Sequence, residues 1–171
     1  IVDFVDIEEE YDRTIEMYLK EIEADFLFST NVSMCKSLDS FRKDEFDYII
    51  IDGSEELNNP ISSIGLSMSD KIVRVYRVCA KDCIWHKSME NLTDLIHIKD
   101  KSVTVINGYD KTCDKLTFLN GLGIKPDFEL PYISNCPVFA NSGKLIYNSR
   151  LSNGQYKRKV QKLAAQLMMG G

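Results

Sequence analysis

The segment "DYIIID", residues 47 to 52, most strongly constrains how this chain can fold. Four apolar residues in succession lead directly into Asp52, and a loop of acids and amides follows. An apolar run without alternation is typical of a strand that is buried on both faces of a parallel sheet. The carboxyl ends of such strands form the edge where open α/β proteins bind ligands. We therefore expect an α/β protein in which Asp52 is a candidate site residue.

The rest of the chain alternates short apolar runs with helical stripes. The predicted strands are 1–6, 25–30, 47–52, 71–78, 102–107 and 127–132, and the predicted helices are 8–24, 34–41, 60–70, 82–97, 115–123 and 153–168. Alternating strands and helices predict βαβ units. We expect a three-layer α/β/α sandwich with a mainly parallel sheet, whose central strands include 47–51, 72–78 and 102–106. At 171 residues, the chain is predicted to be a single α/β domain over 1–171.

Charge and targeting signals narrow the function classes. The net charge of -5 argues against a nucleic-acid partner, because phosphate binding needs a basic patch. The basic run at 156–162 is interpreted as the solvated face of a helix. No stretch approaches 18 apolar residues and the start has no signal-peptide pattern, so we expect a cytoplasmic protein without a transmembrane segment. Because the chain begins at Ile1 rather than Met, we expect further sequence upstream.

The cysteines and histidines do not indicate a metal site or a triad. Five cysteines without paired spacing are expected to be reduced thiols. Cys79, Cys83 and His86 lack the remainder of a four-ligand zinc set. His86 and His97 fall in or beside one predicted helix with no promising nucleophile near them in the sequence, so we interpret both as surface or boundary histidines.

Candidate site residues are those that follow the predicted parallel strands. For Asp52 the alternative is a structural acid that caps a turn or the next helix. A phosphate-binding G-x-x-x-x-G-K-[ST] loop occurs nowhere in the chain. The "GLG" at 121–123 follows a helix and is interpreted as its cap. The strand-end candidates are Asp3, Asp6, Asp52, Cys79, Asn107 to Asp110 and Pro131 to Ile133.

Taken in order, several segments resemble the MinD/ParA family of deviant-Walker P-loop ATPases, and within it the pilus-assembly proteins called TadZ or CpaE. The similarity covers 45–168. "FDYIIID" looks like the Walker B strand of that family, "SVTVINGYDK" like the strand that ends in asparagine, and "LPYISNCPVFANSGKLIYN" like the closing proline segment. The resemblance implies a P-loop NTPase-like, Rossmann-like fold, with this chain as the C-terminal part of the ATPase domain.

The resemblance also implies roles for the strand-end residues. Asp52 would be the catalytic and metal residue, holding Mg²⁺ through water. Asn107 would read the adenine, with backbone at Pro131, Tyr132 and Ile133 beside it. The implied cofactors are ATP and Mg²⁺ in the full-length protein, with none tightly bound to this chain. The implied partners are a second copy, since members of this family often dimerise across ATP, or proteins of a bacterial pilus or secretion machinery.

The chain departs from the family pattern in two respects. The deviant Walker A loop is absent, and Glu55 and Glu56 add negative charge where a triphosphate would sit. Two explanations are open. Either the Walker A loop lies upstream of Ile1, or the protein is a degenerate member of the family that has lost ATP hydrolysis. Glu55 and Glu56 slightly favour the degenerate member.

Two alternatives come from other classes. A receiver-like signalling domain would use Asp52 as phosphoacceptor beside Asp3 and Asp6, but no lysine followed by proline ends the strand at 102–107. The second alternative is a scaffold that binds no nucleotide and works through its surface.

Overall fold

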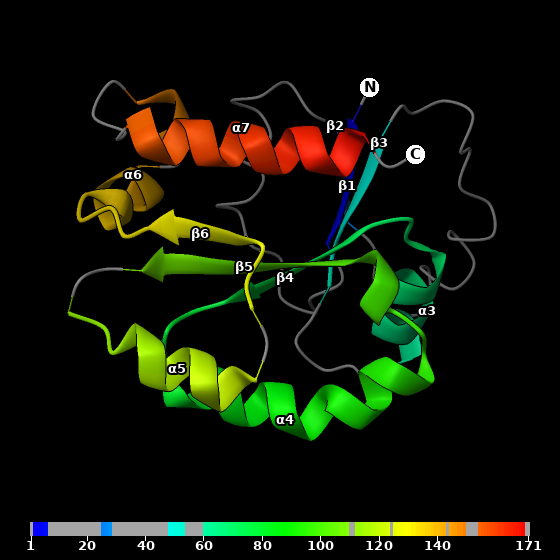
Figure 1. Cartoon of the computed structure of the whole chain (residues 1–171). Helices are drawn as coiled ribbons and strands as arrows, with labels where there is room; N and C mark the ends of the chain where they lie inside the picture. The colour runs from blue at the N-terminus through cyan, green and yellow to red at the C-terminus, as the bar shows by residue number, and fades with distance from the viewer. Residues whose placement is uncertain are drawn as a thin grey trace. The chain divides into compact units, whose positions relative to one another are not determined.

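The computed structural model describes residues 2–6, 25–28, 48–53, 60–109, 112–123, 125–142, 144–149 and 154–169, and it shows an α/β chain (Figure 1). The strands are β1 (Val2–Asp6), β2 (Asp25–Phe28), β3 (Tyr48–Asp52), β4 (Ile72–Tyr76), β5 (Ser102–Tyr109) and β6 (Phe128–Pro131). The helices are α3 (Pro60–Met68), α4 (Ala80–Leu95), α5 (Lys115–Leu122), α6 (Cys136–Asn141) and α7 (Gly154–Met168), with 3-10 turns η1 (Lys99–Lys101) and η2 (Ile146–Asn148). The helices predicted at 8–24 and 34–41 lie outside the described residues.

The chain divides into two units. The first comprises Ile1–Met68 with Pro137–Leu145, and the second comprises Ser69–Cys136 with Ile146–Gly171. Each contains a three-stranded sheet, in the orders β2-β1-β3 and β4-β5-β6. Every strand pairing among the described residues is parallel, which confirms the predicted α/β class and its parallel strands.

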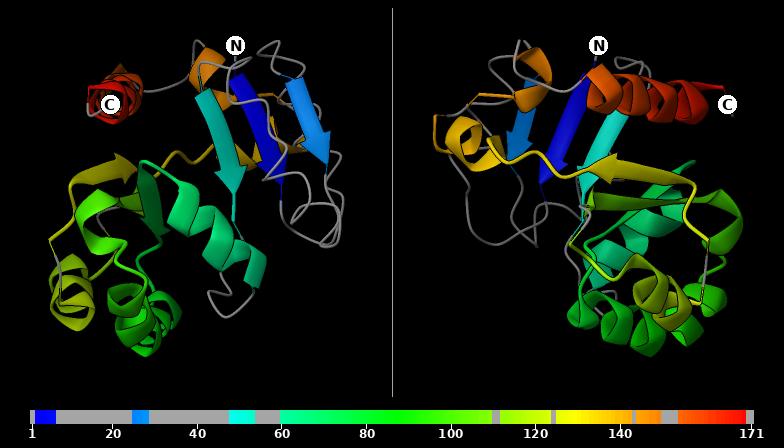
Figure 2. Two further views of the ribbon diagram at one scale, coloured as in Figure 1. Left: turned by 90° about the vertical axis from the view of Figure 1, so that its right-hand side faces the viewer. Right: turned by 60° about the vertical axis from the view of Figure 1, so that its left-hand side comes forward.

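The second unit has three layers because the side chains of its sheet alternate between two apolar clusters. On one face, Tyr76 and Ile106 pack with Phe118 and Leu122 of α5, and α4 adds Cys83 and Trp85 to the rim. On the other face, the cluster of Val103, Val105 and Leu130 is covered by Tyr156, Val160, Leu163 and Leu167 of α7. The strand β5 is therefore buried on both sides at 103–106, in agreement with its mostly apolar sequence there. Figures 1 and 2 show α7 on one side of this sheet and α4 with α5 on the other.

The helix ends follow local chemistry. Pro60 opens α3, where the missing N–H of proline has no helical partner to lose. Asp114 caps α5 by accepting the Thr117 N–H at 3.0 Å. Gly123 ends the same helix in the left-handed conformation with φ of 75°, which confirms the predicted glycine cap.

Two strand ends differ from the prediction. β4 ends at Tyr76 rather than at residue 78, because the Arg77 N–H donates to the Asp82 carboxylate at 2.6 Å instead of to the sheet. β5 continues past the predicted end at residue 107 to Tyr109. That extension contains a register shift and Gly108 with φ of 74°, a conformation that glycine adopts without strain.

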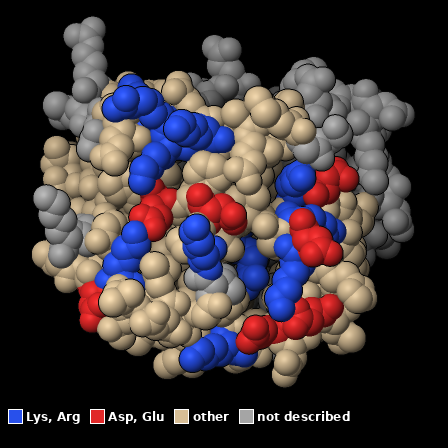
Figure 3. All heavy atoms as spheres, viewed as in Figure 1, with Lys and Arg blue, Asp and Glu red and all other residues tan. Residues whose placement is uncertain are grey.

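The basic run at 156–162 lies on α7, and Figure 3 shows Lys and Arg side chains gathered there. Arg158 and Lys162 are exposed, as predicted for a solvated face. Lys159 is instead half-buried and donates to the Glu129 carbonyl, while the Lys157 ammonium lies 5.6 Å from the centre of the Tyr147 ring. Part of the basic face therefore anchors α7 rather than facing solvent.

Candidate functional site

The structure brings Asn107 and the segment 131–133 to one edge of the second sheet. They lie at the carboxyl ends of the neighbouring strands β5 and β6, where Tyr109 is the register partner of Pro131. The Tyr132 N–H donates to the Tyr109 carbonyl at 2.7 Å, which extends the pairing one residue beyond the strand. Asn107 and Tyr132 are exposed, whereas Ile133 is half-buried. An exposed amide and an exposed phenol ring can therefore offer hydrogen bonds and a stacking face to a planar ligand.

A lysine that the sequence reasoning did not select lies at the same edge. Lys115, the first residue of α5, forms an ion pair of 2.5 Å with Glu129 of β6, and both side chains are about 30% exposed. Its ammonium also lies 5.0 Å from the centre of the Tyr109 ring. The pair thus ties α5 to the ends of β5 and β6. The sequence reasoning did not select Lys115 because it ended β5 at residue 107, before Tyr109, whose ring the lysine contacts.

Asp52 lies in the first unit, where it ends β3. It is exposed and is the register partner of Asp6, which ends β1, so the backbone places two acids at the ends of adjacent parallel strands. Adjacent strands of a sheet lie about 4.8 Å apart, so the backbones of these two residues are neighbours at this edge. Asp3, the other acid of β1, is the register partner of Ile49, away from the strand end. Asp110 lies outside the described residues.

Cys79 has a local structural partner at the carboxyl end of β4. It is the N-cap residue of α4, and its thiol donates to the Asp82 carboxylate at 3.0 Å. Asp82 accepts from both the Cys79 thiol and the Arg77 backbone, so it organises the turn between β4 and α4. Within the described part of the chain, no group of three or more Cys, His, Asp or Glu residues is arranged to hold a metal ion.

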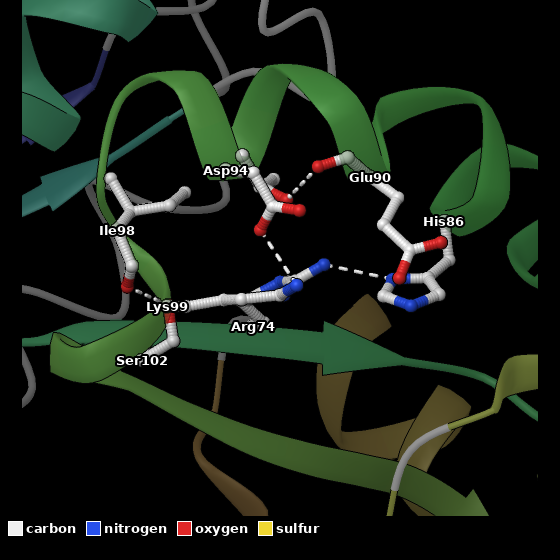
Figure 4. A network of polar contacts seen from close by, with 8 residues as sticks. Arg74, His86, Glu90, Asp94, Ile98, Lys99 and Ser102 are labelled. Atoms are coloured by element: carbon white, nitrogen blue, oxygen red, sulfur yellow. Dashed lines mark hydrogen bonds and ion pairs between the residues drawn. The ribbon is translucent and has the colours of Figure 1, made fainter.

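The interpretation of His86 as a surface or boundary residue was wrong. His86 is 3% exposed, and its Nδ1 lies 2.8 Å from Arg74 Nη2 (Figure 4). The same nitrogen lies 3.0 Å from the Tyr76 hydroxyl. Helix α4 places this ring toward β4, where alternation directs Arg74 and Tyr76 to the same face of the strand. His97 is exposed, as expected, and has φ of 54° just after α4.

Comparisons with known proteins identify the fold. No family model and no curated protein matches the chain. Among solved structures, the MinD cell division protein of Aquifex aeolicus superposes with a TM-score of 0.70 at 14% identity, covering 99% of this chain and 85% of that one. A ParA family ATPase from Chlorobium tepidum TLS gives 0.70 at 12% identity, covering 96% and 85%. The MinC:MinD cell division protein complex of Aquifex aeolicus gives 0.67 at 13% identity, covering 99% and 84%.

These likenesses establish that the chain has the fold of MinD and ParA ATPases. They agree with the fold implied by the sequence motifs. Among the described residues, no helix has the length and apolar character needed to cross a membrane.

Proposed function

We propose that this chain is a MinD/ParA-like ATPase domain, or a degenerate member of that class, that works in spatial positioning or assembly. The TadZ- and CpaE-like motifs favour a bacterial pilus or secretion system as the machinery, with a second copy or a machinery protein as partner in the cytoplasm. The chain is proposed to form a single domain over 1–171, the C-terminal part of the ATPase domain. Its cofactors would be ATP and Mg²⁺ in the full-length protein.

The observation that carries this proposal is the common edge formed by Asn107 and residues 131–133 in a chain with this fold. The Asn107 amide would hydrogen-bond the adenine edge, and the backbone beside Tyr132 would complete its recognition. The bond from the Tyr132 N–H to the Tyr109 carbonyl supports this role, because it fixes that backbone before a ligand arrives. Lys115 and Glu129 would stiffen the same edge from α5.

The acid at the end of β3 supplies the proposed metal residue. Asp52 would hold Mg²⁺ through water, since carboxylates and water are the ligands that this hard cation prefers. Asp6, its register partner, would add a second negative charge to the same sheet edge. If hydrolysis has been lost, the domain would use bound nucleotide, or its surface alone, to recruit partners.

Calorimetric titration of the full-length protein with ATP and Mg²⁺ tests this proposal. We expect saturable binding that Asn107→Ala weakens roughly 2- to 10-fold, the range for one neutral hydrogen bond. Asn120→Ala, at an exposed asparagine of α5, is the matched control and should leave binding unchanged. Absence of binding at millimolar ATP would exclude nucleotide binding and leave the scaffold and the receiver-like domain. Equal binding by both variants would remove Asn107 from the site.

The register of Asp6 and Asp52 also favours a second candidate, the receiver-like phosphoacceptor. In that function, Asp52 would accept a phosphoryl group while Asp6 helps to hold Mg²⁺. Incubation with acetyl phosphate and Mg²⁺, followed by mass spectrometry, should then detect phosphorylation that Asp52→Asn abolishes. An unmodified wild-type protein under these conditions would exclude this candidate.

A further inference from the structure

We propose that His86 is part of an acid-sensitive latch that holds α4 against β4 only while the imidazole is uncharged. The latch consists of His86 on α4 with Arg74 and Tyr76 on β4. It lies within the second unit and is independent of any nucleotide chemistry at the strand ends.

The three side chains converge on a single nitrogen atom. Arg74 Nη2 lies 2.8 Å and the Tyr76 hydroxyl 3.0 Å from His86 Nδ1. The Tyr76 and His86 rings pack edge to face with centroids 5.5 Å apart, and the guanidinium carbon of Arg74 lies 5.6 Å from the centre of the Tyr76 ring. Tyr76 and His86 are 2% and 3% exposed, so water has little access to the contact. Figure 4 shows Arg74 and His86 pointing toward each other across the interface between strand and helix.

Donor and acceptor chemistry determines the protonation state that this geometry requires. A guanidinium can only donate, and it does not lose its proton in proteins. Nδ1 must therefore accept, which requires a neutral ring with its proton on Nε2. A proton on Nδ1 would replace the hydrogen bond with two donors facing each other at 2.8 Å, and it would add a second positive charge to a buried site.

The surrounding charges do not offset that repulsion. On α4, Glu90 favours a charged ring and Lys87 opposes it. Lys99 of η1 also opposes it, although Lys99 is paired with Asp94 at 2.6 Å. Burial first, and then Arg74, lower the pKa of His86 below its usual value.

Protonation therefore requires α4 to separate from β4. Because the folded pKa is depressed, the folded contact is favoured above the ordinary histidine pKa of about 6.5 and weakens as pH falls below it. The turn from Arg77 to Cys79 connects the end of β4 directly to α4. Opening of the latch would thus change the carboxyl end of β4, which gives the second unit a pH-dependent state.

Hydrogen exchange of the full chain tests the proposal without any variant. Between pH 7.5 and 5.5, histidine is the side chain whose ordinary titration falls in the window. After correction for intrinsic exchange rates, peptides from 80–95 should lose several-fold in protection, up to the limit of about 10-fold that one histidine with an ordinary pKa of about 6.5 allows at pH 5.5, while peptides from 102–109 retain theirs. Loss of protection in both segments together would indicate ordinary acid unfolding and overturn the latch, as would unchanged protection of 80–95.

The single tryptophan and the second histidine provide matched variants. Trp85 precedes His86 on α4 and packs at the rim of the Tyr76 cluster, so its fluorescence reports on the latch. His97→Gln should keep the fluorescence change with acid, whereas His86→Gln should lose it, since a glutamine oxygen accepts from Arg74 at every pH. Persistence of the change in a folded His86→Gln protein would overturn the proposal. If His86→Gln does not fold, an NMR titration of wild-type His86 that gives a pKa at or above 6.5 would do the same.

Discussion

Replacement of Ile106 by alanine removes three carbon atoms from the centre of the second unit. Ile106 is 0% exposed and packs with Tyr76, Phe118 and Leu122. Transfer of three carbons to water costs about 2.5 kcal/mol at about 0.8 kcal/mol each. Two of the neighbours are rigid aromatic rings that cannot fully close the cavity, so we expect a total loss of about 3 to 4 kcal/mol. For a chain of this size, that corresponds to a fall in melting temperature of roughly 6 to 16 °C.

The matched control is Ile84→Ala, the same chemical change at a side chain that is 69% exposed on α4. Its free energy of unfolding should change by no more than about 0.5 kcal/mol, since alanine also favours the helix. Urea denaturation followed by far-UV circular dichroism and by Trp85 fluorescence measures both variants. A loss below about 1 kcal/mol for Ile106→Ala, or equal losses for the two variants, would show that the packing around β5 is not as described.

Three further outcomes are expected. Gly123→Ala should destabilise by about 1 to 2 kcal/mol in thermal melts because φ is 75° there, whereas Gly154→Ala at the first residue of α7 should be neutral; equal effects would contradict the cap. Asp52→Asn in the full-length protein should leave the melting temperature within a few degrees and weaken Mg²⁺-dependent activity; clear destabilisation with full activity would make Asp52 a structural cap. This 171-residue chain should show neither tight ATP binding nor hydrolysis in calorimetry and phosphate-release assays, because it contains no phosphate-binding loop; tight Mg²⁺-dependent binding would refute this.

The strand and helix pattern of the second unit was readable from local sequence. Mostly apolar runs predicted β4 and β5, and the helical pattern at 153–168 predicted α7, whose Val160, Leu163 and Leu167 pack against the sheet. The ends of the strands were harder to predict from the sequence, because they depend on which acceptor pairs with each backbone N–H. Asp82 takes that of Arg77 and so ends β4 early.

The sequence selected some residues of the candidate site and missed others. The sequence predicted Asp52 and Asn107 at strand ends; Asp52 ends β3, whereas Asn107 lies two residues before the end of β5. It did not select Lys115, whose contact with Glu129 joins residues 14 apart in the chain but on different elements. The short helix α6 also escaped prediction, because six residues are too few for a periodic signal.

By itself, the sequence determined the class of the fold, because apolar runs that alternate with helical stripes are typical of βαβ units. It also determined the identity of the acids and amides that follow those runs. It did not determine burial: Tyr48 and Ile50 of β3 are 47% and 49% exposed, although the apolar run that contains them predicted a strand buried on both faces. Only the tertiary structure decided the state of His86. One turn of α4 and the alternation of β4 bring an imidazole, a guanidinium and a phenol to one buried point, and whether a histidine is charged depends on what surrounds it in space rather than along the chain.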